Sequence, residues 1–283
     1  MPLSLLHGLG MNLDRISIYC FAACYTLAFV LELGELLRPG RPLRWLRRAL
    51  AAAGLVAHTA YIASNAMPLQ GGHSVVMLLS LILAVYYLSG TFHYQRTAWG
   101  LFVLPVILLL VALARWQPQS LAPIVPPPEQ GQQIWVWLHL VFLLFGQVGL
   151  CVAFMASLMY LVKWSQLRRK SVLGASVPMP NLERLETIHR RAVNLAFPLF
   201  TCGLLIGFLL MLQTGSMRWS DSKLVTAGLL WIVFALLMLV RYLLHVRGRW
   251  VALLTILAFG FLLAALVLPW FWPSAHPTAG GVP

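Results

Sequence analysis

Charged residues are scarce in this chain, and acidic residues are the scarcest. Only 10% of the 283 residues are charged, and 20 Lys and Arg face 7 Asp and Glu, which gives a formal net charge of +13. Average soluble domains carry about 25% charged residues. Since 60% of the residues are hydrophobic and the mean hydropathy is +0.84, an ordinary soluble globular protein is excluded. The basic residues occur in short clusters between long apolar runs, a pattern typical of a protein embedded in a lipid bilayer and not of a nucleic-acid partner.

Cysteine is also rare, and its spacing excludes two further classes of site. The four cysteines all lie inside apolar runs and form no C-x-x-C pair, so neither a thiol-redox motif nor a zinc site is supported: Cys20, Cys24, Cys151 and Cys202. The N-terminus lacks the basic region and the small-residue cleavage site of a signal peptide. We therefore expect the first apolar run to be a retained transmembrane helix.

Long apolar runs dominate what the sequence does contain. They predict an all-α polytopic membrane helix bundle of about eight transmembrane helices, forming one integral membrane domain over residues 1–283. The span at 99–114 is short and is compatible with a tilted or partly re-entrant segment. The expected spans are 16–37, 49–67, 74–92, 99–114, 134–163, 194–213, 223–245 and 250–272.

The basic residues predict how these helices are oriented. With the N-terminus outside, sixteen Lys and Arg fall in the inner segments and only four in the outer ones: Arg15, Arg115, Arg218 and Lys223. Because positive charge accumulates on the cytoplasmic side, both termini are expected outside the cytoplasm. On the inner side, "NLERLETIHRR" predicts a short amphipathic helix at the membrane surface, with Leu182, Leu185 and Ile188 on one face.

Ionisable residues at membrane depth are the first candidates for a functional site, because they are costly there. His139 lies near the outer end of the fifth span, and Gly146, Gln147, Cys151 and Ser157 accompany it as a small and polar stripe that should face the bundle. From spacing alone, His139 is either a cofactor ligand or a structural residue that forms an interhelical hydrogen bond, and both alternatives stay open.

The remaining intramembrane groups have structural interpretations as strong as functional ones. Glu32 and Glu35 share a face at the inner end of the first span, where pairing with loop arginines such as Arg38 and Arg41 explains them without a proton relay. Arg241 and His245 form an i, i+4 pair at the inner end of the seventh span, and this pair suits either the helix C-terminus or an anionic ligand such as a carboxylate. Gly203 and Gly207 form a G-x-x-x-G that allows a close helix crossing.

Several segments together resemble the cytochrome c assembly family, which comprises haem-handling membrane proteins of the CcsA, CcmC and HemX types. The segments are "LVAHTAYI", "WVWLHLVFLLFGQVGLCVAFMASLMYLVKW", "LETIHRRAVNLAFPLFTCGLLIG" and "LLWIVFALLMLVRYLLHVRGRW". The resemblance covers most of the chain and is clearest from Trp135 onward. It implies a multi-pass protein of the bacterial cytoplasmic membrane, with haem b as the expected cofactor.

The outer loop between the sixth and seventh spans departs from the family pattern. The family signature reads W-G-x-x-W-x-W-D-P-K, whereas this chain has "TGSMRWSDSK". Asp221 stays in register, but the signature tryptophans are missing and Trp219 stands one place off. By this resemblance the chain belongs to a divergent HemX-like branch and is not a complete cytochrome c synthase subunit.

The resemblance also implies which residues contact haem. His139 is the expected outer axial ligand and His245 the inner one, with His276 as the match to the family's second outer histidine. Trp219 and Asp221 belong to the haem-presenting loop, and Arg241 is a cation for a haem propionate. His139 and His245 are expected near opposite faces of a hydrocarbon layer about 30 Å thick, so they do not bind one iron together.

Three functions are compatible with the sequence. The first is haem binding and trafficking in support of cytochrome c biogenesis, together with an assembly partner protein and with no catalysis by this chain alone. The second is a HemX-like membrane regulator or scaffold for a haem-pathway enzyme. The third, a small-molecule transporter, is disfavoured because no paired, glycine-broken half-helices are found.

Overall fold

The computed structural model describes residues 17–38, 40–64, 72–93, 98–116, 133–168, 178–213, 222–243 and 248–268. Across these ranges the chain forms eight α-helices and no β-strand, which confirms the predicted all-α class. The helices group into two compact units, Met1–Leu121 and Ala122–Pro283, with four helices in each. The expectation of one domain over residues 1–283 stays a prediction, and each unit is described by itself.

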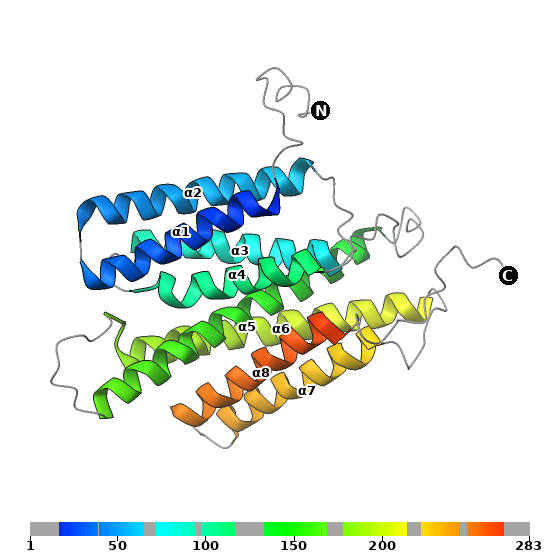
Figure 1. The fold of residues 1–283 in the computed structure, drawn as a ribbon. Helices are drawn as coiled ribbons and strands as arrows, with labels where there is room; N and C mark the ends of the chain where they lie inside the picture. Colours follow the sequence, from blue (N-terminus) through cyan, green and yellow to red (C-terminus); the bar gives the residue numbers. More distant parts are fainter. Residues whose placement is uncertain are drawn as a thin grey trace. The chain divides into compact units, whose positions relative to one another are not determined.

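The first unit contains α1 (Ile18–Leu37), α2 (Arg41–Ser64), α3 (Gly72–His93) and α4 (Gly100–Trp116). Each helix packs against two others, because α1 contacts α2 and α4 while α3 contacts the same two helices (Figure 1). Large apolar side chains fill the space between the four helices, among them Phe21, Tyr25, Met77, Tyr87, Leu104 and Ile107. In a bilayer, close van der Waals packing of these side chains holds the four helices together, since the lipid tails are as apolar as the core.

The second unit has the same ring of contacts. It contains α5 (Gln133–Arg168), α6 (Leu182–Gln213), α7 (Ser222–Tyr242) and α8 (Arg249–Val267). Here α5 packs on α6 and α8, and α7 packs on α6 and α8 (Figure 1). Phe154 of α5 stacks on Phe259 of α8 with ring centroids 3.9 Å apart, and Phe200 and Phe234 join α6 to α7. The unit therefore has a core of its own.

Six of the eight helices are long and apolar enough to cross a membrane, which supports a multi-pass membrane protein. The two helices that do not meet these criteria of length and hydropathy are α2 and α4. The 17 residues of α4 reach about 25 Å, less than a hydrocarbon layer of about 30 Å, as expected for the short fourth span. In α2, four arginines in the first two turns lower the hydropathy of a helix that is otherwise long enough.

Two helix starts differ from the sequence-based prediction. The second span was expected from residue 49, but α2 begins at Arg41, because Pro42 is well tolerated in a first turn and arginine favours helix. The segment "NLERLETIHRR" is helical as predicted, but it is not a separate surface helix. It forms the first turns of α6, whose buried face runs through Leu185, His189, Val193 and Ala196.

Glycines allow α5 and α6 to pack most closely. A Cβ added to Gly146 would lie 2.8 Å from Phe200, and one added to Gly203 would lie 2.8 Å from Leu143. The G-x-x-x-G of α6 therefore permits the close crossing that its spacing predicted. This crossing brings the backbone of α6 within hydrogen-bond reach of side chains on α5.

Candidate functional site

His139 lies in the second turn of α5 and turns toward α6. Its Nδ1 lies 2.7 Å from the carbonyl oxygen of Gly203. The ring also occupies the space that a side chain on Gly207 would need, because an added Cβ there would collide with the imidazole. Gly203 therefore binds the His139 ring through its carbonyl, and Gly207 leaves the space that the ring occupies. We call these two glycines the glycine seat.

The partner of His139 decides which ring nitrogen carries the proton. A carbonyl oxygen only accepts hydrogen bonds, so Nδ1–H must be the donor to Gly203 and Nε2 must carry the lone pair of the neutral imidazole. A backbone carbonyl that accepts from one nitrogen while the other faces a metal is the common arrangement for metal-binding histidine. The ring is half-buried, as its position near the end of the helix predicts.

The polar stripe on α5 faces the interior of the unit as predicted. Gly146, Cys151 and Ser157 are buried, and the buried Oε1 atom of Gln147 has no hydrogen-bond partner among the residues that the structure describes. Ser157 donates its hydroxyl proton to the Ala153 carbonyl of its own helix at 2.8 Å. Within the stripe, His139 forms a hydrogen bond to another helix, whereas small residues such as Gly146 allow the helices to pack closely.

Most of the other predicted site residues lie outside the described residues: Trp219, Asp221, His245 and His276. Arg241 is described and lies at the end of α7. Its Nη1 donates a hydrogen bond of 2.5 Å to Nδ1 of His189 on α6. The sequence had suggested that Arg241 acts together with His245, and the partner that the structure adds is His189.

His189 links three helices. Because its Nδ1 accepts from Arg241, its Nε2–H is the donor to the Thr255 hydroxyl of α8, 2.8 Å away. Thr255 in turn donates to the Val251 carbonyl at 2.8 Å. His189 and Thr255 are both buried. Sequence spacing did not single out these two residues, although His189 lies on the i, i+4 stripe of Leu185 and Val193.

A small cavity lies beside this chain of hydrogen bonds. Its internal volume is about 20 Å³, and its wall is formed by α5, α6, the end of α7 and the start of α8. The polar part of the wall comprises Ser157, Tyr160, Glu186, His189 and Arg241. Gly248, the N-cap of α8, also lines the cavity with a φ of +77°, and an added Cβ would lie 3.0 Å from the Tyr160 hydroxyl oxygen.

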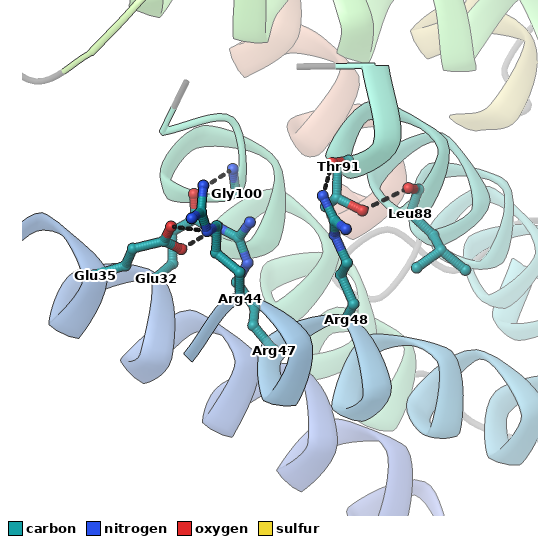
Figure 2. A network of polar contacts seen from close by, with 8 residues as sticks. All are labelled: Glu32, Glu35, Arg44, Arg47, Arg48, Leu88, Thr91 and Gly100. Carbon is teal, nitrogen blue, oxygen red and sulfur yellow. Dashed lines mark hydrogen bonds and ion pairs between the residues drawn. The ribbon is translucent and has the colours of Figure 1, made fainter. Parts of the chain in front are cut away.

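In the first unit, Glu32 and Glu35 form ion pairs, as the structural interpretation predicted. The partners are Arg47 and Arg44 and not Arg38 or Arg41, because α2 starts early enough to bring those arginines beside α1 (Figure 2). Arg47 pairs with the buried carboxylate of Glu32 and lies 3.3 Å from that of Glu35. The other oxygen of Glu32 accepts from Gly100 N–H at 3.2 Å, at the start of α4.

Two more buried histidines lie in the first unit. His58 stacks on Phe21 with ring centroids 4.2 Å apart, and its Nδ1 lies 3.4 Å from the Tyr25 hydroxyl. His73 donates from Nδ1 to the Ala114 carbonyl in the last turn of α4, at 2.6 Å. Across the part of the chain that the structure describes, no three His, Cys, Asp or Glu side chains gather as a metal site.

The family profile described as "Cytochrome C assembly protein" matches residues 70–274. The chain belongs to the cytochrome c assembly family. The match begins ahead of α3 and runs past the end of α8, so it contains His139, His189 and Arg241, while α1 and α2 precede it. The HemX-like branch within the family stays a prediction.

Two curated relatives are similar to this chain. The chain is 24% identical over 205 residues to "Cytochrome c biogenesis protein CcsA" of Guillardia theta, covering 64% of this chain and 66% of that protein. It is 25% identical over 183 residues to the protein of the same description from Chlamydomonas reinhardtii, covering 61% of this chain and 49% of that one. The chain thus spans just under two thirds of the first relative's length and about half of the second's. No solved structure gives a significant match.

Proposed function

We propose that this protein binds haem in a bacterial cytoplasmic membrane and delivers or holds it during cytochrome c biogenesis, together with an assembly partner protein. Membership of the cytochrome c assembly family and the six helices able to span a membrane support this role. The two relatives are described as cytochrome c biogenesis proteins, and the same process is proposed here for this chain.

The single observation that carries the proposal is the orientation of His139. Its Nδ1–H is committed to the Gly203 carbonyl, and the glycine seat fixes the plane of the ring, so Nε2 is preorganised as an iron ligand. The donor set fits haem b, whose iron accepts neutral imidazole nitrogens in its axial positions. When bound, haem supplies the iron and the porphyrin that the assembly process handles.

The other proposed contacts follow from the family resemblance. His276 is the proposed second ligand on the outer side, and Trp219 and Asp221 belong to the proposed haem-presenting loop. His245 is the proposed ligand on the inner side.

Two positions on α6 mark the two sites. Gly203 binds His139 and His189 binds Arg241, and these residues are 14 positions apart along the helix, or about 21 Å. This separation supports two distinct sites, because one iron does not reach both.

The test replaces His139 by Asn. The Asn amide nitrogen takes a position close to that of Nδ1 and keeps a donor for the Gly203 carbonyl, while the atom corresponding to Nε2 is removed. We expect the purified variant to lose at least about tenfold in haem affinity, an energy of about 1.4 kcal/mol. Added imidazole should restore binding, since it enters a vacated ligand position. His93→Ala, at an exposed histidine at the end of α3, is the matched control and should leave haem content unchanged.

The two remaining outcomes argue against the proposal. Unchanged haem content in His139→Asn would show that His139 has only a structural role in joining α5 to α6. A purified wild-type protein that has no Soret band and takes up no haem, but captures a cytosolic haem-pathway enzyme, would favour the regulator or scaffold function.

A further inference from the structure

The arginines in the first turns of α2 lie on two faces of the helix. Arg44 and Arg47 turn toward α1 and pair with its glutamates (Figure 2). Arg41, Trp45 and Arg48 follow one another at intervals of four and three residues, so they share a second face, which we call the outward face of α2. We propose that this outward face binds the phosphate headgroup of an anionic phospholipid. Such a lipid site is independent of haem binding.

The positive charge of the outward face has no counterion among the acidic residues of the first unit. The sequence contains two acidic residues between positions 15 and 128, Glu32 and Glu35, and the inward-facing arginines pair with both. Asp14 lies four residues before the other end of α1, and a chain of four residues does not reach back along a helix about 30 Å long. The segment 94–97, which lies outside the described residues, adds one arginine and no acidic residue. Among the residues that the structure describes, the outward-facing arginines therefore remain without an ion pair.

Neutral groups hold Arg48 in place. Its Nη2 donates to the carbonyl oxygen of Thr91 in the last turn of α3, 2.9 Å away (Figure 2). Its guanidinium carbon lies 5.0 Å from the ring centroid of Phe92 and 6.0 Å from that of Trp45. A carbonyl oxygen and two aromatic rings orient the guanidinium and do not cancel its charge. Since a guanidinium presents N–H donors in a planar fork that matches phosphate oxygens, Arg48 is oriented for an anion by the contacts that join α2 to α3.

The outward face changes from basic to apolar along α2, in the order in which a phospholipid changes from phosphate to acyl chain. Trp45 is 70% exposed and Val56 is 69% exposed, and a separation of eleven residues, or about three turns, places them on one side of the helix. Phe92 of α3, 53% exposed, extends the aromatic surface beside Arg48. Tryptophan concentrates at the headgroup level of a bilayer, and arginines near the surface attract anionic lipids. An acidic protein would satisfy the arginines but not the apolar side chains below them, so an anionic phospholipid is the occupant that fits both.

The test uses the full-length protein in lipid nanodiscs and reads the lipids at this surface alone. In a cysteine-free variant, Leu46→Cys places a bimane label on an exposed position beside Trp45. Quenching of the label by brominated phosphatidylglycerol is compared with quenching by brominated phosphatidylcholine, which has the same phosphate but no net charge. With both outward-facing arginines present, we expect the relative binding constant to favour phosphatidylglycerol by at least about tenfold.

Three charge variants of the labelled protein locate the site. Arg41→Gln and Arg48→Gln should each lower the preference for phosphatidylglycerol about fivefold. Arg41 is exposed, so its replacement tests the surface even if Arg48→Gln loosens the contact of α2 with α3. Arg115→Gln, at an exposed arginine at the far end of α4, is the matched control for loss of one positive charge and should keep the preference. Equal quenching by the two brominated lipids before any arginine is replaced would overturn the inference, as would equal preferences in Arg41→Gln and Arg115→Gln.

Two soluble probes distinguish a lipid from other anions, each added at constant ionic strength. Glycerol 3-phosphate has the headgroup chemistry without acyl chains, and polyglutamate stands in for an acidic protein. We expect neither probe to reduce quenching by brominated phosphatidylglycerol, because neither contacts the apolar part of the outward face. Displacement of the lipid by glycerol 3-phosphate would instead indicate a site for a free phosphate, and displacement by polyglutamate would indicate an acidic protein partner. Either result would overturn the assignment to a phospholipid.

Discussion

The pair of Glu32 and Arg47 shows how ionisable groups are accommodated at the inner end of α1. Both side chains are buried, and Glu35 and Arg44 extend the pair into a network of equal positive and negative charge. Burial of a charge is costly unless it is paired and hydrogen-bonded, and here the Gly100 N–H adds a hydrogen bond to the Glu32 carboxylate. The network therefore joins α1 and α2 to the first turn of α4.

Removing Arg47 should be far more damaging than removing Arg44. Arg47→Met leaves Glu32 buried without its cation, so we expect a loss of about 3–5 kcal/mol in the free energy of unfolding. The Arg44 side chain is 32% exposed and pairs with Glu35. Arg44→Met should therefore lower the free energy of unfolding by less than about 1 kcal/mol. Equilibrium unfolding in mixed micelles, followed by helical circular dichroism, measures both. Equal losses would contradict the central place of Arg47 in the network.

The sequence indicated some of the contacts at the candidate sites and could not predict others. Spacing singled out His139 as a candidate because glycine and polar neighbours recur with it at helical intervals, and its contact with Gly203 agrees with a stripe that faces the bundle. The bond of His189 to Arg241 joins residues 52 positions apart on different helices, which no local spacing encodes. The partners of Glu32 depend on where α2 begins, and a cluster of arginines is compatible with both a loop and a helix.

At the scale of helices, the apolar runs of the sequence located the eight helices that the described residues form, but the ends of these helices were harder to predict. The start of α2 was placed too late because its arginines were assigned to the loop, although paired arginines are stable in a helix. The amphipathic segment before the sixth span predicts a short helix at the membrane surface because its leucines share a face. In the structure this segment continues into α6, and Leu185 is buried there together with His189.

The α5–α6 crossing gives a prediction about glycine. Gly207→Ala places a Cβ against the His139 ring, so the two helices must separate or the ring must rotate. We expect a loss of about 1–3 kcal/mol in stability and a lower haem content. Gly228→Ala in α7 is the control, because nothing lies within 4 Å of the added Cβ, and it should be neutral or stabilise the helix by up to about 1 kcal/mol. Similar behaviour of the two variants would mean that the glycine seat is not tight.

At the scale of the whole molecule, the distribution of basic residues predicts sidedness. In a cysteine-free variant, a single cysteine at Trp116, 75% exposed at the end of α4, should react with an impermeant maleimide in intact cells. A cysteine at Arg168, exposed at the end of α5, should react only after permeabilisation. The reverse labelling would invert the membrane orientation and exchange the outer and inner assignments of His139 and Arg241.

The Glu32 network also has a consequence for biosynthesis. Arg47 follows Glu32 by 15 residues, whereas Gly100 follows it by 68 residues. During translation, α1 and α2 therefore become available as a hairpin in which the carboxylate already has its counterion, long before α4 leaves the ribosome. The first two helices should accordingly enter the bilayer as a pair. The N-terminus of α4 should pack against them later, when the Gly100 N–H donates to the Glu32 carboxylate that is already paired with Arg47.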